Sequence, residues 1–214
     1  MWRLGAPIAA LFLLAGCATT GVIRGSVRMP APPNRTGPTA RQSVERLSAP
    51  GARTRDVVVF VDRLPEKAMR RVPKPVARPA VIQAHNQFVP HVLPVVRGTT
   101  VRFENRDAVY HNTFSVSPAK RFDLGKYRPG ESRSVTFDRL GAVNLFCDLH
   151  PGSSGFVLVV PNSAYTQPDA RGGFALPPLP RGWYKVKFWH PVLGERSRRV
   201  EIPKRGDASV ELNF

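Results

Sequence analysis

Residues 146–156 read FCDLHPGSSGF and are the most informative stretch for the fold, because they place Cys147 and His150 three positions apart. Residues 142–146, AVNLF, alternate in apolar character as a strand does, and residues 156–160, FVLVV, form a second apolar run. A tight loop between two such strands would hold the thiol and the imidazole on one rigid rim. A Cys-x-x-His pair alone is a weak signal, so its meaning depends on the rest of the chain.

The first residues, MWRLGAPIAALFLLAGCATT, have the pattern of an export signal, with an apolar run from Ile8 to Ala15 that is too short to span a bilayer. Its end, LAGC, resembles a bacterial lipoprotein box, in which the cysteine is lipidated and becomes the first mature residue. The resemblance implies that residues 1–16 are a signal peptide and that Cys17 anchors the protein to the periplasmic face of the envelope. Ala18 after the cysteine favours the outer membrane. A plain secretory signal with an incidental cysteine is the alternative.

The cysteine count limits what Cys147 can do. The chain has only two cysteines, so a lipidated Cys17 would leave Cys147 without a disulfide partner. A free thiol in an oxidising compartment is prone to oxidation unless a metal or a deep core protects it.

The chain is strongly basic, with a formal net charge of +17. Removal of residues 1–16 takes away only one charged residue, Arg3, and leaves +16. This excess favours attraction to anionic surfaces such as envelope phospholipid, lipopolysaccharide or an acidic protein partner. Export separates the protein from nucleic acid, the other usual partner of a basic chain, so we expect no nucleic-acid binding.

The pattern after the signal predicts an all-β protein. Residues 17–55 contain one short strand (21–27) and then a Pro/Arg-rich linker without sustained apolar periodicity. Short β-branched runs separated by Gly, Pro, Asn and Asp follow, and no segment has a long helical period, which favours a sandwich or a Greek-key barrel. The predicted strands are Val57–Val61, Val92–Val96, Thr99–Glu104, Ser132–Phe137, Ala142–Cys147, Gly155–Val160, Trp183–Trp189 and Ser209–Phe214.

A third ligand for a metal should come from another strand end. The segment HNTFSVS supplies His111 directly after the strand-and-turn pattern VRFENRDAVY. Two imidazoles and one thiolate form the trigonal donor set of electron-transfer copper sites.

These residues resemble the cupredoxin family, the plastocyanin-like blue-copper proteins, over roughly residues 80–160. The likeness includes the phrase VVRGTTVRFENRDAVYHN and the stretch CDLHPGSSGFVLVV. It implies a Greek-key β-sandwich over residues 62–161 and one type 1-like copper ion held by His111, Cys147 and His150. It also implies that Asn112 stabilises the loop carrying the thiolate.

One position departs from the family pattern. The family places a methionine three residues after the second histidine, where this chain has Ser153. A hydroxyl is a poor ligand for soft copper, so Ser153 is not expected to take the axial role. The copper would then be three-coordinate or weakly capped by a carbonyl or water. A degenerate site, a zinc site and a free thiol are the alternatives.

A second resemblance covers the C-terminal part. The stretch YTQPDARGGFALPPLPRGWYKVKFW resembles the carboxypeptidase regulatory-like, prealbumin-type β-sandwich, and the motif GVIRGSV near the mature start resembles the first strand of that module. The resemblance implies a sandwich built from residues 162–214 together with 21–27 and 57–61, with the cupredoxin domain inserted. A tandem order of two domains is the alternative.

The sequence shows no enzymatic constellation. GSSG lacks the strand–turn–helix setting of a serine nucleophile, and the few carboxylates are scattered. His85, His91 and His190 are expected to be packing or surface residues. We therefore expect an envelope-anchored copper-binding electron carrier that is not an enzyme and that meets an acidic redox partner. A structural lipoprotein without metal, and copper storage or delivery, remain the alternatives.

Overall fold

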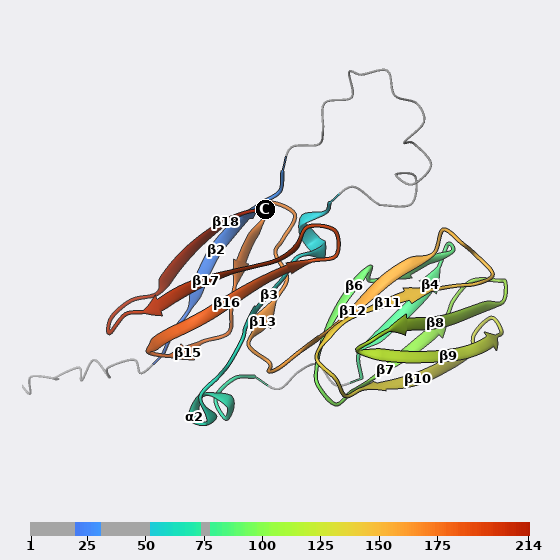
Figure 1. The fold of residues 1–214 in the computed structure, drawn as a ribbon, viewed down its shortest axis with the longest axis horizontal. Helices are drawn as coiled ribbons and strands as arrows, with labels where there is room; N and C mark the ends of the chain where they lie inside the picture. The colour runs from blue at the N-terminus through green and yellow to red at the C-terminus, as the bar shows by residue number, and fades with distance from the viewer. Residues whose placement is uncertain (1–19, 31–51, 74–77) are drawn as a thin grey trace, which may run out of the picture.

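The computed structural model describes residues 20–30, 52–73 and 78–214, which form two β-sandwiches lying side by side (Figure 1). Residues 1–16, Cys17 and the linker residues 31–51 lie outside the described residues, so the signal and anchor expectations stay predictions. The all-β prediction is confirmed, because the described elements are almost entirely strands.

The first sandwich is built from segments far apart in the sequence. One sheet has the order β13-β3-β16-β17 and the other the order β14-β2-β18, with a small β1-β15 pair beside them. In Figure 1 the blue β2 lies against the red β18, to which it is parallel. Its strands are β1 (Thr20–Gly21), β2 (Ile23–Arg28), β3 (Val58–Val61), β13 (Tyr165–Thr166), β14 (Gly173–Ala175), β15 (Leu179–Pro180), β16 (Gly182–His190), β17 (Gly194–Ile202) and β18 (Ala208–Asn213).

The second sandwich is formed by the chain between β3 and β13. Its sheets have the orders β10-β7-β4-β5 and β6-β12-β11-β8-β9, an arrangement consistent with a cupredoxin-like sandwich. The strands are β4 (Ala80–Ala84), β5 (Gln87–Val89), β6 (Val92–Val96), β7 (Thr99–Asn105), β8 (His111–Ser117), β9 (Lys120–Tyr127), β10 (Ser132–Phe137), β11 (Gly141–Phe146) and β12 (Ser154–Val160).

Each sandwich has its own apolar core, and a smaller cluster joins the two. In that cluster Val58 and Phe60 of β3 pack with Leu158 of β12, and the rings of Phe156 and Trp189 meet edge-on at 6.0 Å between centroids. Both faces of β3 and β12 are therefore covered, which explains why these strands read as continuous apolar runs.

The described helical elements are short. A 3-10 turn, η1 (Thr54–Asp56), precedes β3, and α2 (Glu66–Met69) follows it. Among the described residues, no helix has the length and apolar character needed to cross a membrane.

His190 at the end of β16 is a buried histidine held as a neutral acceptor. Its side chain is 1% exposed, and its Nδ1 accepts the backbone N–H groups of Val192 and Leu193 at 3.1 and 3.2 Å. Burial lowers the pKa of His190, although the Asp56 carboxylate partly opposes this shift.

The free energy of unfolding of the metal-free protein should therefore fall as the pH is lowered below about 6.5, the usual histidine pKa. The unfolded chain binds a proton at His190 in this range while the folded chain resists it, so stability rises with pH. Urea unfolding at pH 7.5 and 5.5 measures this dependence. His190→Asn should flatten it, exposed His85→Asn should not, and equal pH slopes in all three proteins would contradict the assignment.

Candidate metal centre

Cys147 is directed into the second sandwich by strand alternation. Val143 and Leu145 of β11 are fully buried, and Cys147, two residues further along, is 3% exposed and packs in the same core cluster. Because side chains two apart on a strand share a face, this pattern points the thiol inward at the end of β11. On the neighbouring strand β8, His111 begins a similar series of buried polar side chains and is 0% exposed.

The structure brings the three predicted ligands together. Cys147 Sγ lies 3.6 Å from His111 Nδ1 and 3.6 Å from His150 Nδ1. The ligand atoms of the three residues all lie within 4.8 Å of one another. Within residues 20–30, 52–73 and 78–214, no other group of three His, Cys, Asp or Glu side chains meets this spacing.

These donors fit a metal ion. Zinc, whose ion is similar in size to that of copper, binds protein sulfur at about 2.3 Å and imidazole nitrogen at about 2.0 Å. Trigonal or tetrahedral angles then separate S and N by roughly 3.6–3.8 Å. The two distances from Cys147 Sγ to the Nδ1 atoms of His111 and His150, 3.6 Å each, lie in this range. Two imidazoles with one thiolate also suit copper by their chemistry.

Asp107 orients His111. Its Oδ2 lies 2.8 Å from His111 Nε2, and its side chain is 16% exposed. Since an ionised carboxylate only accepts, Nε2 carries the proton and Nδ1 keeps its lone pair toward Cys147. Burial would raise the pKa of Asp107, but the N–H groups of Asn86 and His85 and the His111 side chain hold it below its usual range. Asp107 could not be identified from the sequence, where its only signal is its place four residues before His111.

Ser153 and Asn112 lie close to the cluster without contacting the ligands through side-chain hydrogen bonds. The Ser153 hydroxyl is 2% exposed and donates to the carbonyl of Asn86. The Oδ1 of Asn112 is buried and has no hydrogen-bond partner among the described residues. The loop-stabilising role expected of Asn112 is thus not visible as a hydrogen bond.

The other candidates are apart from the cluster. His85 occupies the β4–β5 turn and His91 the connection to β6. His91 Nδ1 pairs with Asp56 at 2.9 Å. Met69 is 54% exposed on α2.

A neutral polar group lies behind the cluster. Tyr127 is fully buried, and its hydroxyl contacts Thr113 Oγ1 at 2.8 Å and donates to Gln83. Burial raises the pKa of Tyr127 to about 12, so its hydroxyl stays protonated at physiological pH.

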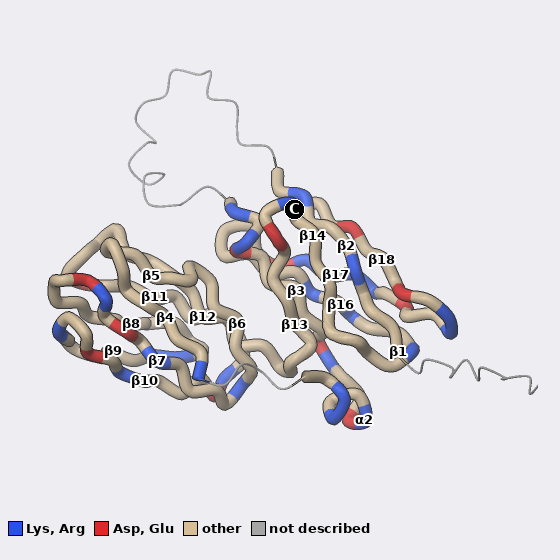
Figure 2. Tube along the Cα trace, turned by 180° about the vertical axis from the view of Figure 1, so that it is seen from behind, with Lys and Arg blue, Asp and Glu red and all other residues tan. Residues whose placement is uncertain are grey.

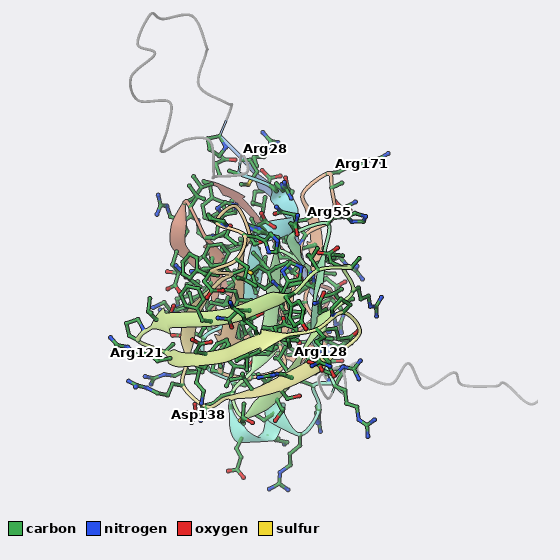
Figure 3. All side chains as sticks on the ribbon, turned by 90° about the vertical axis from the view of Figure 1, so that its right-hand side faces the viewer. Arg28, Arg55, Arg121, Arg128, Asp138 and Arg171 are labelled. Atoms are coloured by element: carbon green, nitrogen blue, oxygen red, sulfur yellow. The ribbon has the colours of Figure 1, made fainter. Side chains whose placement is uncertain are left out.

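Positive charge is spread over the surface. Lys and Arg occur on both sandwiches rather than in one patch (Figure 2), and Arg121, Arg128 and Arg171 reach outward (Figure 3). The loop at residues 147–153 contains no Lys or Arg. The basic character is therefore a property of the whole molecule, and the candidate site itself is not basic.

The second sandwich is thus cupredoxin-like in its two packed sheets and in the His–Cys–His cluster at one end. No protein-family model matches the chain, and no curated protein sequence does.

Solved structures resemble part of the chain. A purple cupredoxin from Nitrosopumilus maritimus is 26% identical, with 38% of this chain and 98% of that protein covered and a TM-score of 0.35. A reduced variant of amicyanin is 28% identical, with 39% of this chain and 85% of its own covered and a TM-score of 0.37. A copper-containing nitrite reductase from Thermus scotoductus SA-01 is 28% identical at a TM-score of 0.37, and the match spans 41% of this chain but only 23% of the enzyme. The three TM-scores are all low.

Proposed function

We propose that this protein binds one copper ion in a type 1-like site and transfers single electrons. The observation that carries the proposal is the group of Cys147 Sγ with the two Nδ1 atoms of His111 and His150, each 3.6 Å from the sulfur. A bound copper ion would supply one-electron redox chemistry at this position.

The three ligands differ in their access to solvent. His111 is 0% and Cys147 3% exposed, whereas His150 is only partly buried. Its ring lies 4.6 Å from that of His111. The edge of His150 is therefore the side of the cluster that a redox partner can approach. The burial of Cys147 shields its thiolate from oxidants.

The second candidate function is a structural or interaction lipoprotein whose site has lost its metal, or a protein that stores copper without transferring electrons. The observation that favours it is Ser153, which stands where the family has methionine and whose hydroxyl is engaged by Asn86. Loss of an axial thioether removes one determinant of the potential and of copper retention.

We also propose that the protein is exported, cleaved before Cys17 and lipid-anchored on the periplasmic face, with the outer membrane favoured. The net charge of +17 supports attraction to an acidic redox partner, with association slowing as salt rises. We propose no enzymatic activity and no nucleic-acid partner.

The first sandwich is proposed to be a noncatalytic carboxypeptidase regulatory-like module that carries the copper domain as an insertion. The pairing of β2 with β14 and β18, and of β3 with β13 and β16, supports this organisation over a tandem order.

Copper loading of the purified protein, produced without residues 1–17, tests the proposed function. We expect one equivalent of copper and an intense visible thiolate-to-copper absorption band that disappears on reduction. Zinc competition under the same conditions is the control for metal choice. Absence of a band together with substoichiometric copper would favour the metal-free structural protein. Stoichiometric Cu(I) without a band on oxidation would favour storage.

A further inference from the structure

The turn between β4 and β5 contacts both segments that carry the candidate ligands. Its central residues, His85 and Asn86, have φ of 54° and 57°, the left-handed values that a two-residue hairpin turn of this type requires. Such a conformation is costly for a residue other than glycine and persists only where the surroundings hold it. Three hydrogen bonds to the backbone of these two residues do so.

Two of these bonds come from Asp107. The backbone N–H of His85 donates to Oδ1 at 2.6 Å, and that of Asn86 donates to Oδ2 at 2.9 Å. The same Oδ2 accepts from His111 Nε2 at 2.8 Å. Asp107 is itself fixed, because its backbone N–H donates to Asn105 Oδ1 at 3.0 Å. One carboxylate thus ties the turn to the first histidine of the cluster.

The third hydrogen bond comes from Ser153, on the loop that follows His150. The Ser153 hydroxyl donates to the carbonyl of Asn86, and the backbone N–H of Ser153 donates to the carbonyl of His150 at 2.8 Å. Ser153 therefore joins the turn to the loop that carries Cys147 and His150. Its buried side chain is used for this contact and makes no side-chain hydrogen bond to the three candidate ligands.

We propose that Asp107, the His85–Asn86 turn and Ser153 form a clamp that positions the His–Cys–His donor set from both sides in the absence of an axial methionine. Asp107 and Ser153 are positioning residues, and neither is a metal ligand. Asp107 fixes the tautomer of His111, and Ser153 fixes the loop against the turn. The inference rests on the proposed function only in naming the three residues as ligands.

The clamp would hold the three donors in place although Ser153 stands where the family has the axial methionine. A ligand loop without an axial bond gains freedom and holds its donors less well. A hydrogen bond from Ser153 to a turn that is already held by Asp107 restores part of that rigidity through the protein, before any metal binds.

Asp107→Asn tests the first half of the clamp. The amide has one acceptor oxygen for three donors, so its NH₂ group is expected to face either a backbone N–H or His111 Nε2. Nitrogen NMR of the metal-free protein should show His111 as the Nε2–H tautomer in wild type and shifted toward Nδ1–H in the variant. Affinity for Cu(I), measured by chelator competition, should fall about 10–100-fold. Asp123→Asn is the matched control, because Asp123 accepts the N–H of Gly125 on the surface and contacts no histidine.

Ser153→Ala tests the second half. In the metal-free protein, amide hydrogen exchange at residues 147–153 should accelerate while the His111 tautomer stays as in wild type. Cu(I) affinity should fall up to about tenfold, the value of one hydrogen bond. Ser153→Thr keeps the hydroxyl and should restore both readouts.

Each of these measurements either supports or contradicts the positioning role of Asp107 or of Ser153. An unchanged tautomer and affinity in Asp107→Asn, or an equal loss in Asp123→Asn, would overturn the role of Asp107. Unchanged exchange in Ser153→Ala together with an altered copper spectrum would make Ser153 a ligand and overturn its positioning role. If wild type binds no copper while the metal-free readouts respond as expected, the proposed function fails and the clamp stands.

Discussion

Residues 163–214, produced as a separate polypeptide, should remain unfolded. They lack β2, the central strand of one sheet, and β3, an inner strand of the other. They also lack several side chains of the core of the first sandwich: Ile23, Val27, Val57, Val59, Val61 and Val72. Burial of each aliphatic side chain contributes about 1.5–3 kcal/mol. The total lost is therefore on the order of 10 kcal/mol, comparable to the whole stability of a domain, about 5–15 kcal/mol.

The matched control joins residues 20–62 to residues 162–214 by a short Gly/Ser linker. The two ends lie together in the structure, because Asn162 Nδ2 donates to the Val61 carbonyl at 2.9 Å and the Val61 N–H donates to the Ala164 carbonyl at 3.0 Å. This chain should show a strand-type circular dichroism spectrum and a cooperative thermal transition, which residues 163–214 alone should lack. A cooperative transition in residues 163–214 alone would contradict the shared sandwich and favour the tandem order.

The strands that could be predicted are those with continuous or alternating apolar residues. The strands that overlap predicted ones are β2, β3, β6, β7, β10, β11, β12, β16 and β18. Two of the missed strands have polar sequences. β8 (HNTFSVS) buries polar side chains such as Thr113 and Ser115, and β17 (GERSRRVEI) is an edge strand exposed along most of its length. These segments form strands because neighbouring strands pair with them. The local sequence pattern contains no information about those neighbouring strands.

Some residues of the candidate site could likewise be predicted from the sequence, and others could not. His111, Cys147 and His150 could be named because ligand types and spacing are local signals in the sequence. Asp107 and Asn86 could not, since their roles depend on a left-handed turn from β4–β5 meeting the β7–β8 loop in space. The chemistry of a hydroxyl predicts that Ser153 is not an axial ligand, but its bond to Asn86 could not be predicted, because it joins residues far apart in the chain.

Cys147→Ser should abolish the visible thiolate-to-copper band completely and weaken copper binding more than any other single change in the second sandwich. The hydroxyl is a far poorer donor to soft copper than a thiolate, and the two remaining imidazoles do not replace the lost soft ligand. The fold should survive, because serine is close to cysteine in size and its hydroxyl can donate to His111 Nδ1 or His150 Nδ1, which lie 3.6 Å from the sulfur. Satisfying the new hydroxyl in this way should limit the loss of stability to about 1 kcal/mol.

The matched control for this variant is His85→Asn. It removes an exposed imidazole outside the His–Cys–His cluster, and asparagine tolerates the left-handed φ of 54° at this position. Visible absorption after titration with one equivalent of Cu(II) should show the full band in His85→Asn and none in Cys147→Ser, while far-ultraviolet circular dichroism shows both folded. A band that persists in Cys147→Ser could not come from a thiolate, because Cys147 is the only cysteine of residues 18–214, and would contradict the assignment of the band. A band lost in both variants would mean that His85 takes part in binding, so the three-residue donor set would be wrong.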